Sequence, residues 1–278
     1  EITGVAKIKT NVWVTESKKI LEDNNMIRQP DMDTIELMEY QEKLFTLGTK
    51  TEVDTLLRGG VKPECMYEVY GEFGSGKTQF CLTLAAEAIA HGHKIVWIDC
   101  EDTFRPRRLA EIIVARGYAI DTEDSKQYLK NIHYYYCPNT EQMMGKVNAL
   151  SPLLTEHKPK LVILDGAIGQ FREEYLGRGT LAERQNQIAH LMTHLKNISY
   201  YFNCTVLFTN QVQSDPSIMF GDPVKPIGGH IVGHASTYRL YFKKSGRKHI
   251  ARMVDSPEDP VADIQFDLTD KGIADVEA

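Results

Sequence analysis

The sequence predicts an α/β fold: a mainly parallel, twisted sheet with helices on both faces and antiparallel edge strands near the C-terminus. Three observations lead to this prediction. Short, continuously apolar segments such as 94–99 (KIVWID) and 161–165 (LVILD) are typical of strands that are buried on both faces. These segments alternate with longer runs of helical periodicity, as in parallel strands connected by crossover helices. The last apolar segments instead follow one another closely around Ser245-Gly246, as in hairpins.

The alternation begins near residue 44, and its first strand is expected at residue 66. The expected parallel strands are 66–70, 94–99, 132–136, 161–165 and 205–209. The expected helices are 77–91, 106–116, 140–156 and 180–202. Gly92 and Gly117 follow the first two helices, and Pro106 begins the second, which are the usual stop and start signals. The expected antiparallel edge strands are 238–243, 250–254 and 264–268.

The first 43 residues lack this pattern. Residues 1–24 are typical of a partial helix-hairpin-helix-like unit, which is too short to bury a core alone. Because the chain begins at Glu1 rather than at a methionine, we expect this unit to be incomplete. Residues 25–43 are polar and turn-rich, which predicts a linker between protomers, and its acidic part from residue 34 to 43 has a helical pattern. The remainder, 44–278, is the predicted core domain.

Composition limits the class of protein. A chain of 278 residues with 42 % apolar residues suits one large domain with a small appendage. The five cysteines form no CxxC pair, which argues against a zinc site and favours a reducing compartment. No apolar run approaches the ~18 residues of a membrane span. The net charge of −6 is unusual for a protein that binds nucleic acid, but local charge governs such binding.

The strongest motif is the glycine-rich segment 71–79 (GEFGSGKTQ), which fits GxxxxGK[ST] between a strand and a helix. Its glycines let backbone N–H groups converge on phosphate oxygens, and the helix N-terminus adds partial positive charge. In this pattern Lys77 contacts the β- and γ-phosphates and the Thr78 hydroxyl binds Mg²⁺. The motif predicts ATP and Mg²⁺ as cofactors, with contacts from Gly71, Glu72, Phe73, Gly74, Ser75, Gly76, Lys77, Thr78 and Gln79.

Polar residues end two further strands of the predicted sheet. Asp165 ends an apolar strand, and we expect it to hold Mg²⁺ directly or through water. Gln211 follows the strand 205–209 and can contact the γ-phosphate, although asparagine and glutamine commonly end strands in turns.

Three carboxylates lie where the strand 94–99 ends. Glu101 is placed to orient or deprotonate the attacking water, because the carboxyl edge of the sheet faces the phosphates. Asp99 and Asp102 compete for this role, and the residues alone do not choose among the three. A solvated acidic turn is the alternative interpretation.

Two glycine-containing loops follow strands of the same sheet. The first contains residues 177–179 (GRG), including Arg178, with Arg172 and Arg184 on either side. The second runs from 213 to 229 and includes Lys225, with His230 directly after it. Arginines and backbone N–H groups can hold a phosphate backbone without reading its sequence. From these residues alone, ordinary solvated loops are the simpler interpretation.

Together these segments resemble the RadA-type DNA strand-exchange recombinases, the archaeal and eukaryotic branch of the RecA-like proteins. The resemblance covers roughly residue 44 to the C-terminus and rests on more than the glycine-rich motif, which any P-loop ATPase shares. The matching stretches are GEFGSGKTQ (71–79), IDCEDTFRPRRL (98–109), REEYLGRGTLAERQ (172–185), FTNQV (208–212), FGDPVKPIGGHIVGHAS (220–236) and DSP (255–257).

The resemblance implies a RecA-like P-loop NTPase core with DNA-dependent ATPase activity. Such proteins form helical filaments on single-stranded DNA, with ATP between protomers, and pair it with a homologous duplex during recombinational repair. The implied partners are single- and double-stranded DNA, further copies of the chain and mediator proteins, with no membrane. The implied location is the cytoplasm for an archaeal protein and the nucleus for a eukaryotic one.

The resemblance also implies roles for single residues. Glu101 becomes the catalytic base, acting with Lys77 and Gln211. Arg108 stacks on adenine, as a planar cation can, and His234 couples the second loop to the nucleotide. The residues implied at the ATP of the neighbouring protomer are Asp255 and Pro257. The residues implied to bind DNA are Arg172, Arg178, Gly179, Arg184, Gln213, Lys225, Gly228, Gly229 and His230.

The chain departs from the family pattern at several positions. The segment joining the helix 77–91 to the next strand is short and omits a further DNA contact, Arg107 replaces an acidic residue, and Gly166 stands where serine is usual. Residues 29–32 lack the phenylalanine of the FxxA motif that joins protomers. Two alternatives therefore remain: a recombinase paralogue that acts as a regulatory ATP-binding mediator, and a ring-forming RecA-fold ATPase or helicase.

Overall fold

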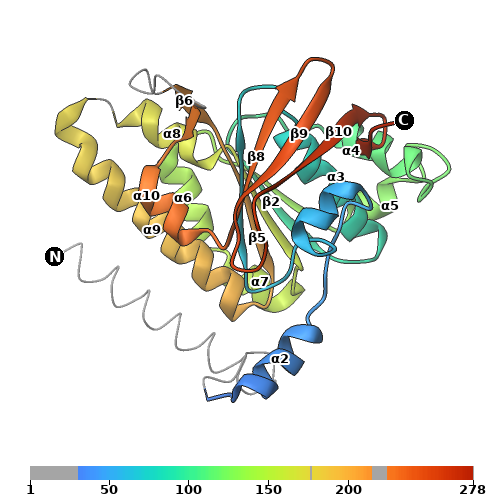
Figure 1. Ribbon diagram of the computed structural model, residues 1–278, viewed down its shortest axis with the longest axis horizontal. Helices are drawn as coiled ribbons and strands as arrows, with labels where there is room; N and C mark the ends of the chain where they lie inside the picture. Colours follow the sequence, from blue (N-terminus) through green and yellow to red (C-terminus); the bar gives the residue numbers. More distant parts are fainter. Residues whose placement is uncertain (1–30, 176, 215–223, 278) are drawn as a thin grey trace.

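The computed structural model describes residues 31–175, 177–214 and 224–277 (Figure 1), so the predicted N-terminal unit 1–24 lies outside the described residues. A nine-stranded sheet has the order β11-β10-β9-β8-β1-β5-β4-β2-β3. Strands β8, β1, β5, β4, β2 and β3 pair in parallel, and β8 to β11 pair antiparallel. The predicted α/β fold, with a mainly parallel sheet and antiparallel strands near the C-terminus, is confirmed.

The strands of this sheet are β1 (Met66–Gly71), β2 (Ile95–Asp99), β3 (Ile132–Tyr136), β4 (Leu161–Asp165), β5 (Thr205–Asn210), β8 (Tyr238–Ser245), β9 (Lys248–Asp255), β10 (Ala262–Thr269) and β11 (Gly272–Asp275). A separate hairpin pairs β6 (Val212–Ser214) with β7 (Val224–Pro226). The helices are α2 (Thr34–Glu42), α3 (Lys77–Ala90), α4 (Pro106–Ala115), α5 (Lys126–Leu129), α6 (Thr140–Asn148), α7 (Ser151–His157), α8 (Ala167–Glu174), α9 (Leu181–Tyr201) and α10 (Gly229–Ala235). Short 3-10 helices are η1 (Glu52–Leu57) and η2 (Arg178–Thr180).

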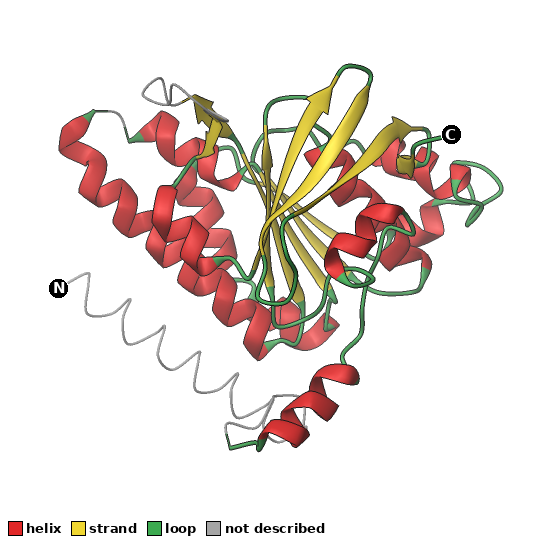
Figure 2. Ribbon diagram, viewed as in Figure 1, coloured by secondary structure: helices red, strands yellow, loops and turns green. Residues whose placement is uncertain are grey.

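Helices cover both faces of the sheet (Figure 2). Alternate residues of each central strand enter different cores: Ile95 and Trp97 pack with α3 and α4, whereas Val96 and Ile98 pack with α6 and α9. Burial on both faces is therefore the reason that these strands are continuously apolar. The sheet is held from both sides, so the residues at its carboxyl edge have a rigid support.

One predicted helix, 140–156, is wrong in detail because the structure contains two. Helix α6 ends at Asn148 and α7 begins at Ser151, with Pro152 in its first turn. Proline has no backbone N–H and its ring collides with the carbonyl of the preceding turn, so it begins helices rather than continuing them.

Helix α2 occupies most of the acidic run 34–43 that precedes the core. A capping box begins it, in which Asp33 Oδ1 accepts from Glu36 N at 2.9 Å and Glu36 Oε2 accepts from Asp33 N at 3.0 Å. None of its residues is buried. No helix in the described ranges combines the length and the apolar character that a membrane crossing requires.

Candidate functional site

The predicted catalytic residues meet at the carboxyl ends of neighbouring parallel strands. The P-loop follows β1, Glu101 follows β2, Asp165 ends β4, and Gln211 follows β5. In the sheet, β5 and β4 lie between β1 and β2. Open α/β sheets bind ligands in the crevice at this edge. The topology thus brings together four segments that are far apart in the chain.

The P-loop forms a cradle with free space above it. Gly74 and Gly76 have φ values of +73° and +99°, which side chains rarely adopt, and no atom lies within 4 Å of the place where a Cβ of Gly74 would stand. No side chain caps the N-terminus of α3, and the buried Ser75 Oγ has no hydrogen-bond partner. The uncapped N-terminus of α3, with its backbone N–H groups and a glycine loop beside open space, fits a bound triphosphate.

Lys77 lies against the loop that it follows. Its Nζ donates to the carbonyl oxygens of Gly71 and Glu72, both at 2.9 Å. Burial lowers the pKa of Lys77, while the carboxylates of Glu101 and Asp165 oppose that change. The ammonium group is therefore close to the cradle, and its present acceptors are neutral carbonyls that phosphate oxygens can replace.

Asp165 is buried beneath the cradle and accepts three hydroxyl hydrogen bonds. Thr209 donates to Oδ1 at 2.5 Å, and Thr78 and Thr103 donate to Oδ2 at 3.1 and 3.3 Å. The pKa of Asp165 is raised to about 6, mainly by burial and secondarily by the nearby Glu101 carboxylate, while the hydrogen bonds from Thr209 and Thr78 oppose this rise. A carboxylate beside the Thr78 hydroxyl is the donor set that Mg²⁺ takes in P-loop proteins.

The three carboxylates after β2 have different surroundings. Asp99 is fully buried and accepts from the backbone N–H groups of Glu101, Thr103 and Phe104 at 3.0 to 3.2 Å. Its carboxylate is thus used to close the turn. Asp102 is exposed, has a φ of +52° and pairs with Arg105 at 3.4 Å.

Glu101 points instead toward the end of β5, where Gln211 Nε2 donates to its Oε1 at 2.7 Å. Both side chains lie over glycines at the start of α8. A Cβ at Gly166 would lie 2.3 Å from Glu101 Cγ, and a Cβ at Gly169 would lie 3.4 Å from Gln211 Nε2. The glycine that replaces the usual serine at position 166 therefore leaves the space that Glu101 occupies.

Arg108 is held beside the P-loop helix. Its Nε and Nη2 donate to Gln79 Oε1 at 3.1 and 3.0 Å, and its Nη1 donates to the Asp270 carbonyl at 3.1 Å. A further bond from Nη2 goes to the Thr269 carbonyl. The structure thus brings together two predicted nucleotide contacts, Gln79 and Arg108, at the turn between β10 and β11.

Several predicted residues of the second loop line one cavity of about 390 Å³, together with His234 and Asp255. The cavity is lined by Tyr70, Gln213, Lys225, Pro226, Gly229, His230, Gly233, His234, Arg239 and Asp255. Gly228 lies next to it as the N-cap of α10, with a φ of +92°. Pro257 is exposed after β9.

A buried polar network beside this cavity was not predicted from the sequence. Arg239 Nε donates to Glu68 Oε2 at 2.6 Å, and Asn210 Nδ2 donates to Glu68 Oε1 and to the Ile227 carbonyl, both at 2.7 Å. The network joins β1, β5 and β8 to the end of the second loop. Glu68 was the residue in the sequence that could have indicated this network, because a carboxylate inside a strand that is buried on both faces requires a partner.

The first-loop residues lie elsewhere along the same edge of the sheet. Arg172 is exposed on α8, Arg178 and Gly179 lie in η2, and Arg184 is on α9. The loop follows β4, and the β6–β7 hairpin follows β5, so both begin at the carboxyl ends of adjacent strands. Of the residues whose side chains the structure describes, Arg172 and Arg184 do not line the cavity of the second loop.

Comparison with known proteins gives the family. Residues 41–276 match the family model described as Rad51. The chain is also 38 % identical to the DNA repair and recombination protein RadA of Cenarchaeum symbiosum (strain A), over an alignment of 285 residues that covers the whole chain and 70 % of that protein. With a P-loop, a buried Asp165 and a Glu101–Gln211 pair at one sheet edge, the chain belongs to the Rad51 family.

Proposed function

We propose that this chain is an ATP-dependent DNA recombinase that forms helical filaments on single-stranded DNA and catalyses homologous pairing and strand exchange. The observation that carries the proposal is the convergence of Lys77, Thr78, Asp165, Glu101 and Gln211 at one edge of a Rad51-family sheet. The RadA relative is named for DNA repair and recombination, which supports the same role here.

The same residues support ATP hydrolysis to ADP and phosphate. The P-loop N–H groups and Lys77 bind the β- and γ-phosphates, and Thr78 and Asp165 hold Mg²⁺, which neutralises charge on the transferred group when bound. Glu101 accepts the proton of the attacking water. Gln211, already hydrogen-bonded to Glu101, connects that base to the γ-phosphate and to the second loop.

Filament formation follows if the ATP of one protomer is covered by the next. Asp255 and Pro257 are exposed at the end of β9 and are available to an adjacent copy. A head-to-tail contact that does not close on itself forms a filament. Nucleotide bound between protomers favours assembly, because a ligand stabilises the state that binds it.

DNA binding is assigned to the two loops. The first loop contributes Arg172, Arg178, Gly179 and Arg184, and the second contributes Gln213, Lys225, Gly228, Gly229 and His230. Arginine, lysine and backbone N–H groups hold phosphates irrespective of base sequence. His234 lies in the cavity of the second loop and is the proposed link to the nucleotide.

A regulatory mediator is the second candidate, because residues 29–32 lack the phenylalanine expected for contact between protomers. Electron microscopy with ATP, Mg²⁺ and single-stranded DNA separates the possibilities. Filaments, together with ATP hydrolysis stimulated by single-stranded DNA, support the recombinase. Small discrete complexes support the mediator, and rings support a ring-forming ATPase.

A further inference from the structure

A ladder of polar contacts outside the phosphate site joins α3 and α4 to the turn between β10 and β11. Residues 79, 83 and 87 share one face of α3, because residues four apart lie one above the other on a helix. Gln79 accepts from Arg108, Thr83 Oγ1 accepts from Ile273 N at 3.0 Å, and Glu87 Oε1 pairs with Arg116 Nη1 at 2.6 Å. The ladder starts two residues after Lys77, so it extends directly from the P-loop.

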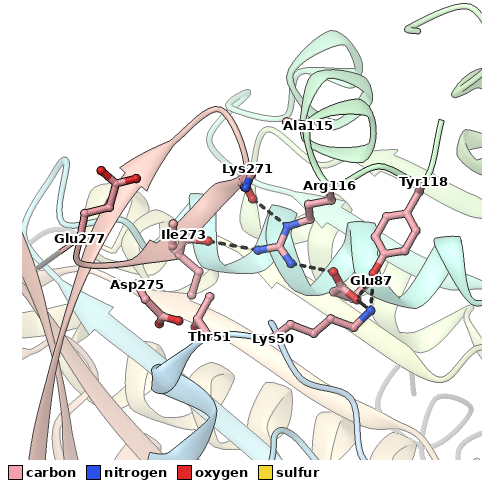
Figure 3. Close-up of a pocket in the computed structure, with 11 residues that line it drawn as sticks. Lys50, Thr51, Glu87, Ala115, Arg116, Tyr118, Lys271, Ile273, Asp275 and Glu277 are labelled. Carbon is pink, nitrogen blue, oxygen red and sulfur yellow. Dashed lines mark hydrogen bonds and ion pairs between the residues drawn. The ribbon is translucent and has the colours of Figure 1, made fainter. Parts of the chain in front are cut away.

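Arg108 and Arg116 together hold the turn by its backbone. Arg116 Nε donates to the Lys271 carbonyl at 2.8 Å, and its Nη2 donates to the Ile273 carbonyl at 3.1 Å. Arg108 donates hydrogen bonds to the carbonyls of Thr269 and Asp270. Figure 3 shows the Arg116 guanidinium between Glu87 on one side and the backbone of Lys271 and Ile273 on the other. The turn that supports Arg108 is therefore also anchored by Arg116.

The end of the turn packs closely against α3. Gly272 has a φ of +86°, and a Cβ there would lie 2.1 Å from Thr83 Oγ1. The Thr83 hydroxyl in turn donates to the Gln79 carbonyl at 2.7 Å. Close backbone approach at this glycine joins the turn to the same helix that carries the P-loop.

Glu87 fixes the far end of the ladder. It is 2 % exposed, and its second oxygen accepts from Tyr118 Oη at 2.6 Å and lies 3.0 Å from Lys50 Nζ. Arg116 also donates to the Thr49 carbonyl at 2.7 Å. Charge-assisted hydrogen bonds with several partners restrict the guanidinium to one orientation. These side chains line a cavity of about 510 Å³ that opens beside the ladder.

We propose that the Glu87–Arg116 pair is a positioning element for recognition of the nucleotide base, acting through the β10–β11 turn on Arg108. The inference rests on the proposed function as an ATPase and on the role that the family resemblance implies for Arg108, which is to stack on adenine. The phosphate contacts come from the first turn of α3, whereas the base contact depends on a turn that two arginines hold. Loss of the Arg116 hydrogen bonds then weakens binding of the base and leaves binding of the phosphates unchanged.

The test compares a ligand that has a base with one that has none. Arg116→Lys keeps the positive charge beside Glu87, but one ammonium group cannot serve the four acceptors of the guanidinium. We expect the dissociation constant for ATP to rise roughly tenfold and that for inorganic tripolyphosphate to stay within about twofold. Arg107→Lys, on the exposed side of the same helix, is the matched control and leaves both constants unchanged.

Steady-state kinetics give a second measurement. The KM for ATP is expected to rise more than kcat falls, and the preference for ATP over GTP is expected to decrease. Equal weakening of ATP and tripolyphosphate, or unchanged ATP affinity in a variant with the wild-type melting temperature, overturns the proposal. If Arg116→Lys does not fold, Tyr118→Phe removes one bond to Glu87, and it must show a smaller change of the same kind. Failure of the wild-type chain to bind ATP refutes the proposed function itself, which separates the two ideas.

Discussion

Gln211 Nε2 and Glu101 Oε1 are joined by a 2.7 Å hydrogen bond, although 110 residues separate the two in the chain. The contact forms because β2 and β5 end at the same edge of the sheet, on either side of β4. The proposed catalytic base is thus held by the residue proposed to sense the γ-phosphate. Any movement of Gln211 toward a nucleotide changes the environment of Glu101.

Glu101→Gln is expected to remove hydrolysis and preserve nucleotide binding. An amide cannot take the proton of water, so kcat should fall by about two orders of magnitude or more. Single-turnover hydrolysis and equilibrium ATP binding measure the two effects. Asp102→Asn is the matched control, because Asp102 is exposed and pairs with Arg105 rather than with the site. A similar loss of hydrolysis in Asp102→Asn would show that the role of catalytic base was assigned to Glu101 wrongly.

Lys77→Ala is expected to abolish ATP turnover. It removes the only ammonium group that the structure places, within its described residues, against the P-loop carbonyls. Loss of a charge that stabilises the transferred phosphate lowers kcat roughly 100-fold or more. A phosphate-release assay measures the change, with the exposed Lys130→Ala as control. Normal turnover in Lys77→Ala would refute the P-loop assignment.

Arg178→Ala is expected to weaken binding of single-stranded DNA equally for all sequences. Each phosphate contact that is lost reduces the slope of log K against log salt by about 0.7 for single strands. Fluorescence anisotropy titrations at several salt concentrations give this slope, and Arg107→Ala, on α4, serves as the control. An unchanged slope would remove Arg178 from the DNA site.

Arg239→Met is expected to destabilise the fold in a pH-dependent manner. Burial raises the pKa of Glu68 above its ordinary value of 4.5, and Arg239 opposes that rise. Without Arg239 a fully buried carboxylate has no counter-charge, which costs about 3–5 kcal/mol of unfolding free energy near neutral pH. Denaturant unfolding at pH 7.5 measures this loss.

The sign of the pH effect follows from the raised pKa. In the variant, Glu68 stays protonated in the folded state up to a higher pH than in the unfolded state. The stability that this protonation contributes is fully present below the pKa of Glu68 in the unfolded state, and it is lost as pH rises through the pKa of Glu68 in the folded state. The difference from wild type should therefore shrink near pH 5. Glu68→Gln in the Arg239→Met background should recover stability at pH 7.5, and a pH-independent loss would contradict the assignment.

Local patterns in the sequence were sufficient to predict the parallel strands, the P-loop and the position of Asp165 at a strand end. Strand burial on both faces produces continuous apolar runs, and a phosphate cradle requires glycines at set spacing before a helix. The position of Gln211 directly after a parallel strand also predicted that it lies at the phosphate site, because the carboxyl ends of parallel strands share an edge. The helix 140–156 was wrong, since Pro152 separates two helices.

The tertiary structure alone distinguished the surroundings of Asp99, Glu101 and Asp102, which lie close together in the sequence but have different contacts in space. It also disclosed the Glu68–Arg239–Asn210 network and the pairing of Arg116 with Glu87. These hydrogen bonds join residues from different strands and helices, and their partners are chosen by backbone position and side-chain direction. Periodicity and motif spacing describe only neighbours along the chain, so they carry no information on such contacts.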